Sequence, residues 1–169
     1  MSPVARMPCA PTFANPLTER MATFVRGIGI AVCAAALPDQ TFLPGLDIRH
    51  GAILIDEARL SYPGDILHEA GHIAVTDPAE RHAPTLSPSV GDELTAIAWS
   101  YAALRHLDID PAVVFHSAFK GGGASIIENF TAGRYFGVPL LQAYGMSCEP
   151  HRAAEKGLPP FPHMLRWMR

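Results

Sequence analysis

The pentapeptide HEAGH, residues 68–72, constrains the fold more than any other stretch of the chain. It lies within DILHEAGHIAV, residues 65–75, whose remaining positions are mostly apolar and are typical of a buried helix. Residues four apart on a helix lie on one face, so the imidazoles of His68 and His72 can reach a single point. Two imidazole nitrogens supply half of a tetrahedral zinc site, and the pattern therefore predicts a zinc-binding helix.

Glu69 lies between the two histidines in sequence but about 100° around the helix from His68. It is badly placed to be a third ligand, yet it can reach a water molecule on the metal. Zinc lowers the pKa of such a water, and a neighbouring carboxylate can take its proton and pass it to the leaving group. The sequence therefore predicts a zinc-dependent metallohydrolase, most simply a peptidase acting on a peptide or protein substrate, with Glu69 as general base.

A catalytic zinc ion needs a third protein ligand and one open position. Asp77 and His82 lie in or beside the loop that follows the motif, while Glu93 opens the next predicted helix. The extended pattern HExxHxxGxxH fails at its glycine and at its third histidine. We favour Glu93 over the other two, because its helix can pack beside the motif helix and Ala96, one turn on, leaves room for close packing.

Five further residues are candidates for supporting roles. Asp65 and Asp92 could accept hydrogen bonds from the outer nitrogens of the zinc histidines, although each could equally be a charge at a helix end. Tyr101, His116 and Tyr135 could donate a hydrogen bond to the oxyanion that forms during hydrolysis. Each of these three is otherwise an ordinary core or surface residue.

The pattern of apolar residues and turn signals predicts an α+β fold with a short β-sheet packed on the active-site helix and a mainly helical C-terminal third. The glycines of KGGG, residues 120–123, are interpreted as a helix stop. The predicted strands are residues 28–34 and 51–56, and the predicted helices are residues 16–27, 63–76, 91–107 and 111–120, with shorter pieces in 124–137 and 139–145.

We expect one zincin-like domain over residues 16–169, preceded by a flexible arm over residues 1–15 that is rich in proline and small residues. Within that domain, residues 16–107 form the zincin core and residues 108–169 form a helical C-terminal part. No internal repeat or second domain boundary is visible.

The segment GAILIDEARLSYPGDILHEAGHIAV, followed by DELTAIAWSYAAL, resembles the core of the ImmA/IrrE-type zinc metallopeptidases, which are small gluzincin-like proteins of bacteria. In that family a helix and two strands precede a helix that carries HExGH, and a glutamate in an ExxA context on the next helix completes the site. The resemblance covers about residues 16–107. It implies a zinc peptidase, and the matching positions are His68, Glu69, Gly71, His72, Glu93 and Ala96.

Composition narrows the classes of partner. The 13 basic residues are scattered and the formal charge is -3, so we expect no nucleic-acid partner. No run approaches the roughly 18 apolar residues that cross a bilayer, so we expect no membrane span. Only 17% of the residues are charged, below the roughly 25% of typical soluble domains, which is compatible with a homo-oligomer that hides part of the surface.

The three cysteines include no C-x-x-C pair, so we expect no disulfide framework and a cytoplasmic, reducing location. Residues 21–38 imitate a secretory signal, but Gly27 and Gly29 weaken such a helix, and we do not favour that interpretation.

Two alternatives to a peptidase stay open at the level of sequence. The first is a zinc-stabilised binding or regulatory module that keeps the metal site without peptidase turnover, which would suit the small size and the unplaced C-terminal third. The second is a helical protein without metal, in which His68, Glu69 and His72 are ordinary residues of an amphipathic helix.

Overall fold

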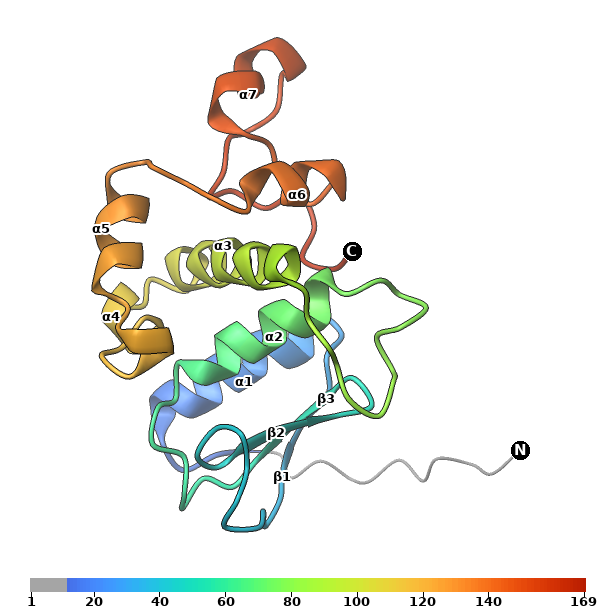
Figure 1. Ribbon diagram of the computed structural model, residues 1–169, viewed down its shortest axis with the longest axis vertical. Helices are drawn as coiled ribbons and strands as arrows, with labels where there is room; N and C mark the ends of the chain where they lie inside the picture. Colours follow the sequence, from blue (N-terminus) through green and yellow to red (C-terminus); the bar gives the residue numbers. More distant parts are fainter. Residues whose placement is uncertain (1–11) are drawn as a thin grey trace.

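The computed structural model describes residues 12–169 and shows an α+β fold, which confirms the predicted fold class (Figure 1). A small sheet packs against α2, and α3 covers the opposite side of that helix. Shorter helices of the C-terminal part follow α3. The elements are α1 (Pro16–Gly27), β1 (Val32–Ala34), β2 (Leu46–Arg49), β3 (Ala52–Ile55), α2 (Asp65–Val75), α3 (Val90–His106), α4 (Pro111–Val114), η1 (Phe119–Gly121), α5 (Ala124–Thr131), α6 (Val138–Ala143) and α7 (Pro150–Lys156).

The sheet has three strands in the order β1-β3-β2. Strand β1 runs parallel to β3, with Val32 opposite Ile53, and β2 runs antiparallel to β3, with Ile48 opposite Ile53. Strand β2 was not predicted, because it is only four residues long and lies in a turn-rich stretch. Its pairing is set by a two-residue hairpin, in which His50 and Gly51 both have positive φ (50° and 74°).

Helix α1 begins and ends where the sequence predicts. The Asn15 side chain accepts hydrogen bonds from the amides of Leu17 and Thr18, so it is the N-cap. The predicted flexible arm falls largely on residues 1–11, which lie outside the described residues. Residues 13–15 belong to the folded domain instead, since Phe13 is buried and the amides of residues 14 and 15 donate to the Glu57 carboxylate.

Helices α2 and α3 pack closely at a pair of small residues. Every residue of α2 except Glu69 is buried. A Cβ atom on Gly71 would lie 3.0 Å from the Ala96 carbonyl oxygen and 3.2 Å from the Trp99 ring, so a side chain there would press on α3. A capping box between Ser89 and Asp92 fixes the first turn of α3. This packing brings the start of α3 beside the histidines of α2.

Replacing Gly71 by valine should therefore reduce the free energy of unfolding by about 1–3 kcal/mol, the usual cost of overpacking a core. Urea denaturation measures the change. The matched control is Gly27→Ala at the end of α1, where a new Cβ meets no atom within 4 Å, and it should change the stability by less than about 1 kcal/mol. Equal midpoints for Gly71→Val and the unaltered protein would contradict the close packing of α2 on α3.

The C-terminal part shares one hydrophobic core with α1, α2 and α3. The Trp99 indole donates a hydrogen bond of 3.0 Å to the Trp167 carbonyl, and the Arg169 amide donates to the Ala74 carbonyl at the end of α2. The predicted helix over 111–120 is wrong, because α4 ends at Val114 and a turn precedes η1. Helix α7 was not predicted.

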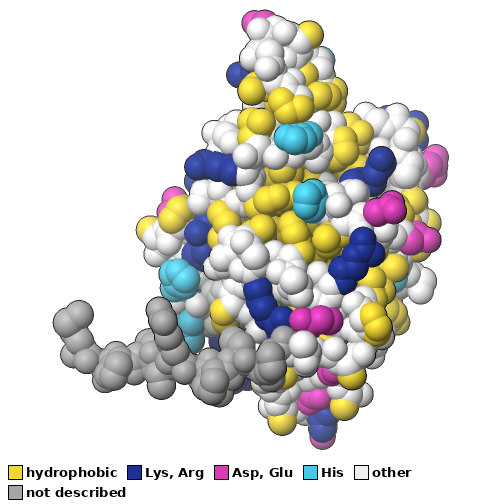
Figure 2. Space-filling model, turned by 180° about the vertical axis from the view of Figure 1, so that it is seen from behind, with side chains coloured by type: hydrophobic (Ala, Val, Ile, Leu, Met, Phe, Trp, Pro, Cys, Tyr) yellow, Lys and Arg dark blue, Asp and Glu magenta, His cyan; other side chains and the backbone are white. Residues whose placement is uncertain are grey.

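Among residues 12–169, no helix is both long and apolar enough to cross a membrane. On the face seen in Figure 2, Lys and Arg side chains are interspersed with Asp and Glu. Cys33 on β1 is disulfide-bonded, whereas Cys148 carries a free and buried thiol. The sequence analysis did not predict the bond at Cys33, and this bond gives no support for a reducing compartment.

Candidate metal centre

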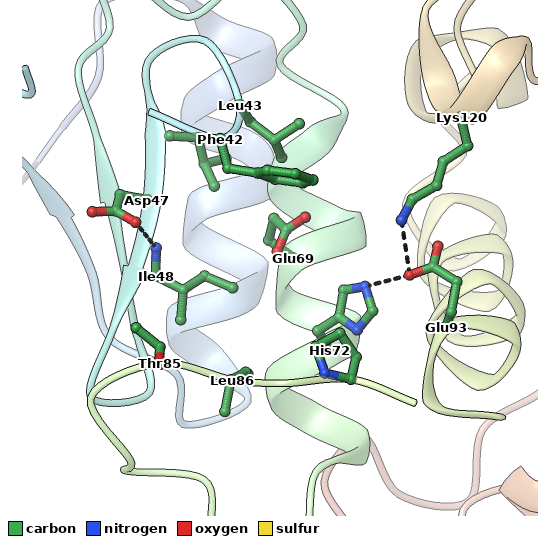
Figure 3. A pocket seen from close by; sticks show the side chains of 12 residues that line it. Phe42, Leu43, Asp47, Ile48, Glu69, His72, Thr85, Leu86, Glu93 and Lys120 are labelled. Carbon is green, nitrogen blue, oxygen red and sulfur yellow. Dashed lines mark hydrogen bonds and ion pairs between the residues drawn. The ribbon is translucent and has the colours of Figure 1, made fainter. Parts of the chain in front are cut away.

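His68, His72 and Glu93 converge at the interface of α2 and α3. The Nε2 atoms of the two histidines are 3.1 Å apart. Glu93 Oε1 lies 3.2 Å from Nε2 of His68, and Glu93 Oε2 lies 2.9 Å from Nε2 of His72 (Figure 3). Both histidines are buried, with exposed fractions of 3% and 6%. Four side-chain atoms from two helices therefore surround one point.

These side chains fit a divalent metal ion. An ion about 2.0–2.1 Å from each ligand in tetrahedral geometry places neighbouring ligand atoms about 3.3 Å apart, close to the observed separations. Glu93 Oε1 is buried and, although it lies 3.2 Å from Nε2 of His68, makes no hydrogen bond with a described residue. Buried carboxylate oxygens without a partner are costly, and coordination would satisfy this one. The group could therefore hold a metal ion.

The two carboxylates of the site have pKa values shifted in opposite directions. Burial alone would raise the pKa of Glu93, but the imidazoles of His68 and His72 outweigh it and hold that pKa well below its usual range. Burial raises the pKa of Glu69, and the imidazoles oppose that rise only in part. Glu93 is thus kept as an anion, while Glu69 binds a proton more readily than an ordinary glutamate. Such a division suits one ligand and one proton acceptor.

A cavity of about 390 Å³ opens in front of the site, between α2, β2 and the loop before α3 (Figure 3). Glu69, the one residue of α2 that is not buried, lies on its wall next to His72. Much of the remaining wall is apolar and includes the strongly exposed Phe42. The cavity is lined by Phe42, Leu43, Leu46, Asp47, Ile48, Glu69, His72, Thr85, Leu86, Pro88, Glu93 and Lys120.

Neither alternative third ligand reaches the histidines. His82 is exposed, and its Nδ1 lies 3.1 Å from the carbonyl oxygen of His50 in the turn between β2 and β3. Asp77 is exposed beyond the end of α2, where it accepts a hydrogen bond from the Ala79 amide. The structure thus brings Glu93, and neither Asp77 nor His82, to the metal-binding group.

The expected support of the histidines by Asp65 and Asp92 is wrong. Asp65 is buried and pairs with His116, whose Nε2 lies 2.8 Å from Asp65 Oδ1. Asp92 accepts hydrogen bonds from Ser89 in the capping box of α3. The Nδ1 atoms of His68 and His72 are buried and have no hydrogen-bond partner among the described residues.

None of the three expected oxyanion donors lines the cavity. Tyr101 is buried within an aromatic cluster that includes Tyr135, and its hydroxyl accepts a hydrogen bond from Arg105. It lies eight residues beyond Glu93 on α3, which is about 12 Å along the helix axis. His116 pairs with Asp65 in the first turn of α2, three residues before His68, and its ring is stacked on that of Tyr62. Tyr101 and Tyr135 are therefore not placed to act as oxyanion donors, whereas the role of His116 stays a prediction.

Lys120 belongs to the site, although it was not among the candidate residues of the sequence analysis. Its Nζ lies 3.1 Å from Glu93 Oε2, and its side chain lines the cavity. The only signal was its place at the start of KGGG, which is equally typical of a helix stop.

Comparison of the chain with protein-family models, with curated proteins and with solved structures found no match. The chemistry of the site is therefore inferred from its own side chains. Those side chains offer two imidazoles and one charged carboxylate to a metal, a second carboxylate beside it, and an ammonium group at the edge.

Proposed function

We propose that the protein is a zinc-dependent peptidase, of the kind to which the ImmA/IrrE-type resemblance points. The observation that carries the proposal is the convergence of His68, His72 and Glu93, with Glu69 beside them on the wall of an open cavity. Two histidines and one glutamate are a ligand set of catalytic zinc sites that retain an open position. A purely structural zinc site would be closed, and it would need no second carboxylate facing solvent.

Each side chain has a distinct task in this proposal. His68 and His72 bind zinc through Nε2, and Glu93 supplies the one negative charge among the ligands. When bound, zinc lowers the pKa of a water molecule and polarises the carbonyl group to be cleaved. Glu69 takes a proton from the attacking water and delivers it to the leaving nitrogen. Its raised pKa suits that task, because a base works best when its pKa approaches the working pH.

The cavity favours an extended peptide as substrate. Strand β2 is at the edge of the sheet, and its residues Leu46, Asp47 and Ile48 line the cavity. A peptide can add to such an edge through main-chain hydrogen bonds, while its side chains enter neighbouring pockets. The apolar wall, including Phe42 and Leu86, suits a bulky apolar side chain beside the bond to be cleaved.

The test uses the full chain loaded with zinc and a mixture of synthetic peptides, whose products are identified by mass spectrometry. We expect cleavage next to bulky apolar residues, complete loss of cleavage after the metal is removed with a chelator, and recovery when zinc is added back. If the protein holds one zinc ion per chain and cleaves no peptide in the mixture, peptidase activity is the wrong conclusion. Cleavage that persists in the metal-free protein would also contradict the proposal.

A further inference from the structure

Lys120 is the only Lys or Arg among the residues that line the cavity. Its Nζ lies 3.1 Å from the same Glu93 oxygen that faces His72. In Figure 3 the Lys120 side chain reaches this oxygen from the side of α3, whereas Glu69 lies on the side of β2. A cation and a proton acceptor thus flank the candidate metal position from opposite sides.

The backbone at Lys120, which places its side chain beside Glu93, is strained. Its φ and ψ angles are 42° and 47°, in the left-handed region, which is unfavourable for a non-glycine residue. Gly121 and Gly122 continue the turn with φ of 85° and 120°. Strain of this kind persists only where surrounding structure holds it, and it is concentrated at functional sites.

Two anchors fix the loop that carries Lys120 to the motif helix. His116 pairs with Asp65 in the first turn of α2. Phe119 is buried and packs edge-on against the ring of His68, with ring centroids 4.9 Å apart. The loop therefore has a defined position relative to the metal ligands, and Lys120 lies directly after the second anchor.

A role in stability does not account for this arrangement. The Lys120 side chain is 49% exposed, and exposed ion pairs contribute little to stability. That gain does not exceed the cost of the strained backbone. Glu93 Oε2 also has His72 as a partner without the lysine. The position of the ammonium group is better explained by contact with a bound ligand.

We propose that Lys120 donates a hydrogen bond to the carbonyl oxygen of the substrate as that oxygen becomes negatively charged. The inference rests on the proposed peptidase function. Water oxygen bonds to the carbonyl carbon, the carbonyl π pair moves to oxygen, and Glu69 takes the water proton. The carbon–nitrogen bond then breaks, its electron pair goes to nitrogen together with the proton from Glu69, and the carbonyl re-forms. Lys120 stabilises the negative charge on the side opposite Glu69.

The test compares Lys120→Met, which removes the charge, with Lys120→Arg, which keeps it. Lys156→Met is the matched control, because Lys156 is exposed on α7. We expect Lys120→Met to lower kcat by about 100- to 1000-fold, the usual loss for one oxyanion donor. KM should change less than about threefold, Lys120→Arg should recover most of the rate, and Lys156→Met should behave as the unaltered protein.

Zinc affinity, measured by competition with a chelator, separates this role from a structural one. Loss of a cation beside a ligand carboxylate should leave zinc affinity unchanged or increase it. If Lys120→Met loses zinc and activity together, the lysine positions Glu93 and the proposal is wrong. An unchanged kcat in Lys120→Met would overturn it as well.

Phosphate binding keeps the proposal testable if no peptide is cleaved. Calorimetry of the zinc-loaded protein with inorganic phosphate, a tetrahedral anion, should show affinity at least about tenfold weaker in Lys120→Met than in the unaltered protein, a difference of about 1.4 kcal/mol. Equal affinities, or no binding of phosphate by the unaltered protein, would contradict the role of Lys120. If no peptide is cleaved but phosphate binding depends on Lys120, the proposed peptidase function is wrong. The anion site at Lys120 is then retained.

Discussion

Replacing Glu93 by glutamine should lower the affinity for zinc by more than about 100-fold, since changes to residues that merely support a ligand already cost about 10- to 100-fold. Glutamine has nearly the same shape, but it removes the only negative charge among the three ligands. Glu93 lies in the first turn of α3, so the helix and its packing should remain. Competition with a coloured chelator measures the affinity, and circular dichroism checks the fold.

Asp92→Asn is the matched control for Glu93→Gln. It removes the same charge one residue earlier, from a carboxylate that caps α3 instead of facing the histidines. It should cost about 0.5–2 kcal/mol of stability through the weakened cap and leave zinc affinity within about threefold. Equal loss of zinc in both variants would mean that the charge of the helix terminus, and not coordination by Glu93, determines binding.

Replacing Glu69 by glutamine should lower kcat by about 100- to 10,000-fold while the protein still binds one zinc ion per chain. The amide cannot accept the proton of the attacking water. Glu69 faces the cavity and lies outside the His68, His72 and Glu93 group, so the ligands should stay in place. We would measure kcat on the peptide that is cleaved fastest. We would also measure the zinc content of the same sample.

Glu80→Gln, at an exposed loop position, is the control for Glu69→Gln and should keep full activity. The Glu69 variant also separates a peptidase from a metal-stabilised binding module. A binding module would retain any biological effect of the protein after this change, because its surface and metal are preserved. Full hydrolytic activity in Glu69→Gln would rule out the assigned general base.

The metal-binding part of the site could be predicted because its geometry is local. His68 and His72 are four positions apart on one helix, and α2 begins and ends close to the predicted bounds. The prediction of Glu93 as a ligand required one further assumption, namely that the helix carrying it packs beside the motif helix. The small residues Gly71 and Ala96 allow that close approach.

The rest of the site depends on contacts between distant parts of the chain. Asp65 pairs with His116, 51 residues away, so its partner could not be read from the spacing of the motif. Lys120 reaches Glu93 because of a left-handed backbone conformation that leaves no clear mark in sequence. Strand β2 gains its register from the hairpin at His50 and Gly51 and from pairing with β3.

The C-terminal helices were the least predictable part of the fold for a related reason. Helix α4 is shorter than predicted and α7 was not predicted; they have four and seven residues. Isolated helices of that length are unstable in water, so their formation depends on packing against the core. The segment that follows α7 is anchored at Trp167, whose carbonyl accepts a hydrogen bond from Trp99 on α3.

The most direct measurement is a crystal structure of the zinc-loaded protein with anomalous data collected at the zinc absorption edge. We expect one zinc ion per chain, about 2.0–2.1 Å from Nε2 of His68 and of His72 and about 2.0–2.2 Å from a carboxylate oxygen of Glu93. A zinc ion held by other residues, such as His82, or no anomalous peak between α2 and α3 with zinc in excess, would contradict this expectation.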